Sequence, residues 1–506
     1  MRGLPGGGGP TSRRSFLVGA GAAAGLLAVG CSTDDRGPGR SAAAAGGGTT
    51  TSTATDGAAR SGAGAKYLSG PYAPVAEELT LPELTVRGRL PTELDGLYLR
   101  NGPNPWPVPD GRYDWFTGDG MVHGLALGDG RARWYRNRWV RTAARAERTG
   151  DPDPGGPAEP FPAPNAGNTS VVRHAGHLLA LYEVGLPHEL TDELDTLGRF
   201  DFGGGLGGPM TAHPKLDPAT GELHLFGYLP GLRYAVADAS GRIVHDEPIP
   251  LPAITMMHDF SLTESYVVFY DLPAVFEPDL LRDTGLPFAW KPDAGARLGV
   301  LPRRGRAADI TWIDVEPAFV YHTVNASDRP DGRGVVLDVV RHDSAFADPD
   351  TFGGQRPPSL HRWTVDVASR RVSDEQLDDR PLELPRIDAR ATGRRTRHAY
   401  AVALADGGAD ANDFAPTLLQ VDLERGGTTE HHVGRGKVPG EAIFVPAADE
   451  AGEDEGWVLS LVLDQDRGTT ELLVLDATDF AGRPVATVEI PARVPVGFHG
   501  AWFPTT

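Results

Sequence analysis

The chain is short of cysteine, of basic residues and of long helical patterns, and each shortage excludes a class of protein. Cys31 is the single cysteine among 506 residues, which rules out an intrachain disulfide and any cysteine-based zinc or iron–sulfur site. Lysine and arginine number 48 against 68 acidic residues, so the net charge of −20 argues against nucleic acid as a partner. Amphipathic patterns at helical spacing are scarce, which argues against a helical fold.

Turn-forming residues are abundant instead, with 65 glycines and 44 prolines. From Tyr67 onward a short β-rich run repeatedly reaches an Asp or a polar turn, and a new strand then begins. Clear strands are predicted at Tyr266–Tyr270, Val335–Val340 and Trp457–Leu463. This pattern predicts an all-β fold, either a propeller of four-stranded blades or stacked sandwiches. The repeats are too irregular to give the number of blades.

The first residues are typical of an export signal followed by a tether. Ser12–Leu17 is a twin-arginine pattern, and the weakly apolar run that follows is too short to span a membrane. Ala28–Cys31 is similar to a bacterial lipobox, which places Cys31 where lipid would be attached. Residues 1–30 are therefore predicted to be a lipoprotein signal peptide, 31–65 a flexible tether and 66–506 the folded domain. The alternative is a signal cleaved elsewhere, with an incidental cysteine.

These signals predict where the mature protein lies. We expect export by the twin-arginine route and anchoring as a lipoprotein on the outer side of the cytoplasmic membrane. Twin-arginine export carries folded proteins, which suits a cofactor loaded in the cytoplasm. A second membrane contact is predicted at Leu272–Trp290, where Phe, Leu and Trp are combined with Pro breaks. The alternative for this segment is an ordinary loop packed over the sheets.

Four histidines share a setting beside apolar runs. The stretch Pro495–Trp502, PVGFHGAW, is apolar and aromatic, so its histidine is expected to be buried and to need a partner. Taken singly, such a residue is more often a core histidine than a metal ligand. The four are far apart in sequence and form no local metal motif, but a propeller brings distant blades together at its axis, where four imidazoles suit iron. They are His213, His258, His322 and His499.

Four longer motifs make the sequence resemble a known family. They are LYLRNGPNP (Leu97–Pro105), WFTGDGMVHG (Trp115–Gly124), NTSVVRHAGHLLALYEVGLP (Asn168–Pro187) and PGEAIFVP (Pro439–Pro446). In this order they resemble the carotenoid cleavage oxygenases, and the resemblance extends over nearly the whole chain after the tether. It implies a seven-bladed β-propeller whose loops and short helices form a cap over one face. His123, within the second motif, occupies a family position that does not bind iron.

The resemblance also implies a site for Fe(II). The four histidines above would bind the ion, and three glutamates would accept hydrogen bonds from the other ring nitrogen of three of them. His213 would have no acidic partner. The expected pairs are Glu183 with His258, Glu383 with His322 and Glu441 with His499.

The activity implied by the resemblance is oxidative cleavage of an alkene. An iron(II) dioxygenase would use dioxygen to cleave a C=C bond of an apolar conjugated carotenoid or apocarotenoid, giving two carbonyl products. The first alternative is cleavage of phenolic stilbenes by the same chemistry. An isomerohydrolase acting on a retinoid ester does not suit a bacterial lipoprotein. A propeller that only binds partners does not explain why all four histidine contexts and the three glutamates are present together.

One position separates the two substrate classes. Stilbene-cleaving members of the family typically have a lysine directly before the first glutamate, where a cation helps to ionise the phenol. This chain has Tyr182 there, and a phenol with a pKa of about 10 supplies no positive charge. Tyr182, Tyr321 and Phe498 are instead predicted to line an apolar site, since aromatic rings pack well against a polyene. The sequence therefore favours a long polyene.

Overall fold

The computed structural model describes residues 65–505, except 111–112, 281–285, 347–353 and 406–412. The predicted signal peptide, Cys31 and nearly all of the predicted tether lie outside the described residues. Among the residues described, no helix is both long and apolar enough to cross a membrane. The only α-helix in this part of the chain is α1 (Ala143–Thr149).

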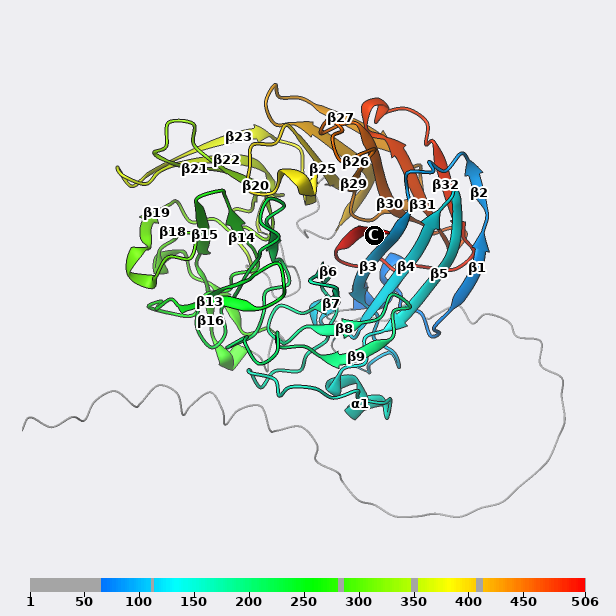
Figure 1. Ribbon diagram of the computed structural model, residues 1–506, viewed down its shortest axis with the longest axis horizontal. Helices are drawn as coiled ribbons and strands as arrows, with labels where there is room; N and C mark the ends of the chain where they lie inside the picture. The colour runs from blue at the N-terminus through cyan, green and yellow to red at the C-terminus, as the bar shows by residue number, and fades with distance from the viewer. Residues whose placement is uncertain (1–64, 111–112, 281–285, 347–353, 406–412, 506) are drawn as a thin grey trace, which may run out of the picture. The chain divides into compact units, whose positions relative to one another are not determined.

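Strands dominate the described residues and form seven sheets of four or more strands, together with one two-stranded hairpin. The larger sheets surround a common centre in Figure 1. This arrangement confirms the all-β prediction and selects the seven-bladed propeller over stacked sandwiches. Blade 1 contains β1 (Thr80–Leu84), β3 (Gly96–Pro103), β4 (Gly120–Gly128), β5 (Arg131–Trp139) and β33 (Gly500–Pro504). Blade 2 contains β6 (Ser170–His174), β7 (His177–Leu181), β8 (His188–Leu190) and β9 (Thr196–Arg199). Blade 3 contains β10 (Lys215–Leu216), β11 (Leu223–Gly227), β12 (Arg233–Ala237) and β13 (Ile243–Pro248).

The remaining four blades follow in chain order, each an antiparallel sheet. Blade 4 contains β14 (Phe260–Leu262), β15 (Tyr266–Asp271), β18 (Arg297–Pro302) and β19 (Thr311–Asp314). Blade 5 contains β20 (Thr323–Asp328), β21 (Gly334–Arg341), β22 (Ser359–Asp366) and β23 (Arg371–Asp378). Blade 6 contains β24 (Leu382–Ile387), β25 (His398–Leu404), β26 (Phe414–Asp422) and β27 (Thr428–His432). Blade 7 contains β2 (Val86–Gly88), β28 (Lys437–Pro439), β29 (Ile443–Pro446), β30 (Gly456–Asp464), β31 (Thr469–Asp476) and β32 (Ala486–Ile490).

The acidic turns predicted from the sequence close the hairpins of the blades. At the end of β26, the Asp422 carboxylate accepts hydrogen bonds from the backbone N–H groups of Glu424 and Arg425, at 3.1 and 2.8 Å. Gly426 follows with a φ of 73°, a left-handed conformation that favours glycine. A short polar side chain and a glycine thus satisfy the turn locally, which is why this pattern recurs between strands.

The hydrophobic core lies between adjacent blades. Tyr98 of blade 1 is buried together with Leu472 of blade 7, and the Tyr400 and Phe444 rings of blades 6 and 7 stack with centroids 5.5 Å apart. Because each blade has a neighbour on both faces, the strands carry long buried runs rather than strict alternation. In β31, for example, the four consecutive residues 472–475 are all buried.

Strands from the two ends of the described chain close the ring. β33 pairs antiparallel with β3, with Gly500 opposite Arg100, and β2 pairs with β32 on the other side of the closure. Blade 1 is therefore completed by the last strand of the chain. The residue that precedes β33 is His499, so closure of the ring also places this side chain.

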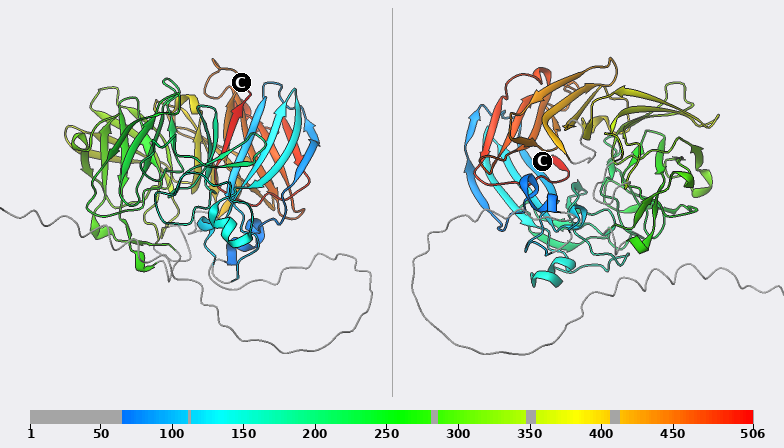
Figure 2. Two further views of the ribbon diagram at one scale, coloured as in Figure 1. Left: turned by 60° about the horizontal axis from the view of Figure 1, so that its bottom comes forward. Right: turned by 180° about the vertical axis from the view of Figure 1, so that it is seen from behind.

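The described segments outside the blades include α1 and a small hairpin. Figure 2 (left) shows α1 at one end of the blades. The segment Leu272–Trp290 contains a small hairpin of β16 (Ala274–Phe276) and β17 (Phe288–Trp290). Leu272 and Phe288 are buried, and none of the described side chains in the segment is among the large apolar groups exposed to solvent. These contacts favour the packed-loop alternative, and a membrane contact here stays a prediction.

Candidate metal centre

Each of the four predicted histidines lies just ahead of the strand at one edge of a blade. His213 and His258 come two residues before β10 and β14, and His322 and His499 come one residue before β20 and β33. β14 and β20 lie beside the centre of the ring in Figure 1. Because each edge strand begins near the axis, residues far apart in the sequence converge there.

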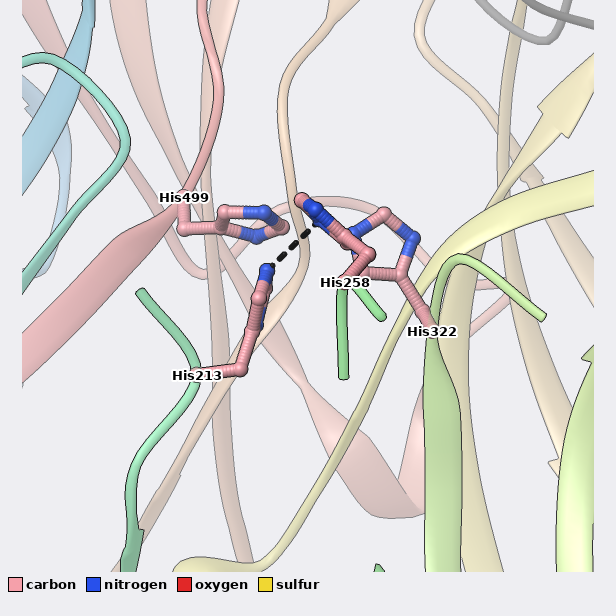
Figure 3. Close-up of side chains that lie close together, drawn as sticks. All are labelled: His213, His258, His322 and His499. Atoms are coloured by element: carbon pink, nitrogen blue, oxygen red, sulfur yellow. Dashed lines mark hydrogen bonds between the residues drawn. The ribbon is translucent and has the colours of Figure 1, made fainter. Parts of the chain in front are cut away.

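The structure brings the four imidazoles together, as Figure 3 shows. One nitrogen from each ring lies within 4.8 Å of those of the others. His213 Nε2 and His258 Nε2 are 2.9 Å apart, and the His213 and His499 ring centroids are 4.5 Å apart in an edge-to-face arrangement. No other group of three or more His, Cys, Asp or Glu among the described residues is placed to hold a metal ion.

Three of the imidazoles are hydrogen-bonded to carboxylates in the pairs expected from the sequence. An ionised carboxylate only accepts hydrogen bonds, so the Nδ1 atom of each ring must donate. This fixes the tautomer and leaves the Nε2 lone pair free to bind a metal ion. The bonds join His258 Nδ1 to Glu183 Oε2 at 2.5 Å, His322 Nδ1 to Glu383 Oε2 at 2.6 Å and His499 Nδ1 to Glu441 Oε1 at 2.9 Å.

Two further residues satisfy these carboxylates and were missed by sequence reasoning. The Tyr228 hydroxyl donates a hydrogen bond to Glu183 Oε1, and His342 Nε2 donates to Glu383 Oε1 at 2.7 Å. Tyr228 is 45 residues from its partner and His342 is 41, so no local pattern links them. The only available signal was chemical, since a buried carboxylate needs donors for both of its oxygens.

Burial keeps two of the imidazoles neutral. Desolvation, reinforced by the neighbouring imidazoles, holds the pKa of His213 well below its usual range. Desolvation also lowers the pKa of His499 to about 4, although the Glu441 carboxylate acts in the opposite direction. Both rings are therefore unprotonated at neutral pH, as a metal ligand must be.

The balance at His322 is different. Burial alone would lower its pKa, but the Glu383 carboxylate more than offsets this effect, and the pKa of His322 is raised. Burial likewise works to raise the pKa of Glu383, but His322 and His342 hold that pKa below its usual range. Glu383 is thus a negative charge that is stabilised by the two imidazoles on its two oxygens.

The donor set fits a transition-metal ion. The Nε2 atom of His322 is buried and has no hydrogen-bond partner in the protein, which is costly unless an ion occupies its direction. Metal–imidazole bonds of about 2.1 Å place two opposite ligand atoms about 4.2 Å apart. The observed limit of 4.8 Å is close to this value, so the rings need to move only slightly. Imidazole ligands suit iron, zinc, copper and nickel.

Aromatic rings adjoin the four histidines. The Tyr321 ring packs edge-to-face on His258 with centroids 5.8 Å apart, and Phe498 packs against Trp115 at 4.4 Å. Burial and the adjacent Glu183 raise the pKa of Tyr182 above its usual value, so this phenol is uncharged. His123 lies in β4 and is hydrogen-bonded to the Tyr135 hydroxyl at 2.9 Å, away from the four-histidine group, as expected.

Comparison with known proteins supports the resemblance stated from the motifs. Residues 72–504 match the protein family described as "RPE65: Retinal pigment epithelial membrane protein". The chain is 42% identical over 497 residues to a carotenoid cleavage oxygenase of Mycobacterium tuberculosis, a match that covers 87% of this chain and 98% of the relative. It is 34% identical over 495 residues to a carotenoid 9,10(9',10')-cleavage dioxygenase of Crocus sativus, covering 86% and 88% of the two chains.

A solved structure shows the same fold. The crystal structure of Pseudomonas brassicacearum lignostilbene dioxygenase superposes with a TM-score of 0.79 at 32% sequence identity, covering 87% of this chain and 98% of that one. The fold, the order of the motifs and the extent of these matches together establish that the chain is an enzyme of the carotenoid cleavage oxygenase family.

Proposed function

We propose that this protein is an iron(II)-dependent dioxygenase that cleaves a C=C bond of a carotenoid or apocarotenoid into two carbonyl products. The observation that carries this proposal is the set of four convergent imidazoles, three of them held through Nδ1 by buried carboxylates. These histidines would hold the ion. Membership of a family of non-haem iron enzymes favours iron among the metals that imidazoles bind.

The reaction needs little from the protein beyond positioning. When bound, the ferrous ion would supply the binding and activation of dioxygen. Cleavage balances without a proton, because one atom of O2 ends in each carbonyl product and no hydrogen is gained or lost. The protein would orient the imidazoles through Glu183, Glu383 and Glu441 and keep water from the site with aromatic rings.

The charges near the site support a polyene over a phenolic stilbene. A stilbene would benefit from a cation that ionises its phenol, but Tyr182 is neutral at the position where the family motif places a lysine. Every lysine of the chain is committed to an ion pair with a carboxylate. The pairs are Lys66 with Asp413, Lys215 with Asp259, Lys291 with Glu277 and Lys437 with Glu471.

The curated relatives support a polyene, since the Mycobacterium tuberculosis protein, named a carotenoid cleavage oxygenase, is 42% identical to this chain. The solved structures do not separate the two classes, since the lignostilbene dioxygenase is 32% identical to this chain and a Synechocystis apocarotenoid oxygenase is 29% identical. An arginine could still supply the missing cation. Arg386 Nη1 lies 3.9 Å from Glu441 Oε1, so the chain has a cation beside one of the glutamates of the site, and the stilbene class is kept as the alternative.

The test combines metal analysis with a comparison of substrates. Iron bound after anaerobic reconstitution should be lost in His322→Ala and retained in His361→Ala, whose histidine is hydrogen-bonded to Asp374 outside the four-histidine group. An apocarotenal in detergent should then have a higher kcat/KM than a 4-hydroxystilbene. A tenfold preference for the stilbene, about 1.4 kcal/mol in transition-state binding, would overturn the substrate choice but leave the iron site intact. Failure of the wild type to bind iron would overturn the proposal itself.

We also propose that the protein acts at a membrane surface. The twin-arginine pattern and Cys31 support export and lipid attachment on the outer side of the cytoplasmic membrane. Carotenoids are apolar and reside in membranes, so an anchored enzyme would be close to its substrate. Leu272–Trp290 is the second contact expected from the sequence, but its described large apolar side chains are buried or half-buried, so we propose lipid at Cys31 as the main attachment.

A further inference from the structure

A buried carboxylate that is not part of the histidine–glutamate pairs lies directly beside the site. Asp259 is only 2% exposed and follows His258 in the chain. Its Oδ1 atom accepts a hydrogen bond from the Phe260 backbone N–H at 2.8 Å and lies 2.7 Å from Lys215 Nζ. Its Oδ2 atom accepts from the Thr323 backbone N–H at 2.9 Å. Both oxygens are therefore occupied, and none of these partners is an imidazole of the site.

The partners of this carboxylate belong to three different blades, and each adjoins a histidine of the site. Lys215 of blade 3 lies two residues beyond His213, and Thr323 of blade 5 directly follows His322. Asp259 itself directly follows the histidine that precedes blade 4. One side chain thus joins the segments that carry three of the four rings in Figure 3.

The fourth histidine is held in a similar way. Glu441 Oε2 accepts a hydrogen bond at 2.7 Å from the backbone N–H of Gly500, the residue that follows His499. Asp259 makes the same contact with the amide that follows His322. In both cases a buried carboxylate fixes the backbone directly after an imidazole, which limits rotation of the whole segment and not only of the ring.

Lys215 compensates the charge of this carboxylate. A buried carboxylate without a partner is strongly destabilising, whereas a close ammonium group and two N–H donors satisfy it. The Lys215 ammonium group is also 5.9 Å from the centre of the Phe260 ring, within the range of a cation–π contact. The lysine therefore has a fixed place between blades 3 and 4.

We infer that Asp259 and Lys215 form a positioning pair that holds His213, His258 and His322 at the spacing a bound metal ion requires. The inference rests on the proposed function, because it assumes that these histidines bind a metal. Neither residue is a catalytic residue here, since neither touches the site where substrate and ion would meet. Their effect is transmitted through the backbone of the three segments.

Two variants separate positioning from a simple effect of charge. Asp259→Asn removes the anion and leaves an uncompensated cation, which would repel a divalent ion. Lys215→Met leaves an anion, which would attract one. A pure charge effect therefore predicts opposite changes in metal affinity, whereas a positioning pair predicts weaker binding in both variants. Lys215→Arg keeps a cation within reach and should restore binding.

The experiment measures Co2+ affinity of the full chain by competition with a chelator, together with the visible spectrum of the bound cobalt. Asp259→Asn should bind about 10- to 100-fold more weakly, as for other residues that support metal ligands, and should change the spectrum. Lys215→Met should change both quantities in the same direction by a smaller factor. These readouts do not depend on the activity of the loaded enzyme.

A matched control is available between the same two blades. Arg303 and Asp217 form an ion pair with side-chain exposures of 17% and 6%, close to the 18% and 2% of Lys215 and Asp259. Asp217 contacts no residue next to a histidine of the site, so Asp217→Asn should reduce stability without changing the cobalt spectrum. Wild-type binding and spectrum in Asp259→Asn, or tighter binding in Lys215→Met, would overturn the inference. A wild type that binds no metal would overturn the proposed function, and this inference with it.

Discussion

The three glutamates beside the histidines each accept hydrogen bonds on both carboxylate oxygens. Glu441 accepts hydrogen bonds on both oxygens, from His499 Nδ1 at 2.9 Å and from the Gly500 backbone N–H at 2.7 Å. Glu183 and Glu383 are likewise bonded on both oxygens. A carboxylate with two donors cannot rotate without losing one of them, so each holds its imidazole in a fixed orientation.

This geometry predicts the effect of Glu441→Gln. A glutamine side chain has one acceptor oxygen and one NH2 group, so either His499 or Gly500 would face a donor instead of an acceptor. We expect metal affinity or activity to fall about 10- to 100-fold while the fold is retained. Iron titration of the variant checks this, with Glu471→Gln in the half-buried ion pair with Lys437 as the control. Unchanged iron affinity in Glu441→Gln would contradict a supporting role for the carboxylate.

The histidine pKa values predict how pH affects the metal-free protein. The pKa of His499 is about 4 in the folded state, against about 6.5 when unfolded, so between these values the unfolded chain binds more protons. Stability should therefore fall as pH drops from about 6.5 toward 4, and His213 acts in the same direction. His322, whose pKa is raised, acts oppositely, since its contribution is present at low pH and is lost as pH rises through its folded pKa.

Denaturant unfolding of the metal-free protein at several pH values between 4 and 7 tests this sign. His499→Gln removes one of the groups that resist protonation, so its free energy of unfolding should depend less steeply on pH than that of the wild type. Equal slopes for the two proteins would show that His499 is not held neutral by burial.

At the scale of elements, the segment that leads into β33 couples ring closure to the site. The Arg100 side chain of β3 is buried, and its Nη2 donates a hydrogen bond to the Pro495 carbonyl at 2.6 Å. Burial lowers the pKa of Arg100 to about 10, so the guanidinium group is still charged at neutral pH. It lies against Gly102 and Gly497, which have no side chains to block it.

Gly497→Ala should therefore affect both stability and the site. A Cβ at position 497 would lie 1.5 Å from Arg100 Nη1 and 3.1 Å from the Gly102 Cα atom. Since Arg100 is buried and hydrogen-bonded, the segment before His499 must shift. We expect a loss of about 1–3 kcal/mol in the free energy of unfolding, together with weaker iron binding. Gly231→Ala, where a Cβ would meet nothing within 4 Å, is the control, and equal effects of the two changes would contradict this account.

The sequence predicted strands better than it predicted their assembly. Tyr266–Tyr270 lies within β15 and Val335–Val340 lies within β21. Both could be predicted because an apolar, β-rich run between two acidic turns favours a strand. β10 has two residues and β14 has three, so neither is long enough to show alternating apolar and polar residues. The sequence pattern alone therefore could not give the number of blades. The blade number came from the family motifs.

The same limit applies to the site. The four histidines lie outside the family motifs and form no local metal motif, but the resemblance that those motifs carry implies them as ligands. Tyr228 and His342 could not be predicted, because their bonds to Glu183 and Glu383 depend on how blades pack and leave no mark in the local sequence. The Asp259–Lys215 contact is of the same kind, since 44 positions separate the two residues, 259 less 215.

At the scale of the whole molecule, the described domain and the first 64 residues have different proposed roles. We propose that the domain binds iron and substrate, and that the first 64 residues direct export and attachment to the membrane. Among the described residues of the domain, the large apolar side chains exposed to solvent are Trp106, Leu197, Leu216 and Val244, and none of these lies in the described part of Leu272–Trp290. Attachment to a membrane is therefore expected to depend mainly on lipid at Cys31.

Cys31→Ala tests this expectation in the full chain. Attached acyl chains contribute about 0.8 kcal/mol for each CH2 group buried in the bilayer, so their loss should move the protein from the membrane fraction to the soluble fraction. Mass measurement of the wild type should show lipid on a chain that begins at Cys31. Substitution of Arg13 and Arg14 by lysine is the control, because it should block export without changing the folded domain. An unmodified Cys31 in the wild type would contradict the lipoprotein assignment. If Cys31→Ala remains on membranes after its signal peptide has been removed, although the wild type carries lipid, the binding must come from the rest of the chain, and Leu272–Trp290 is the segment to test next.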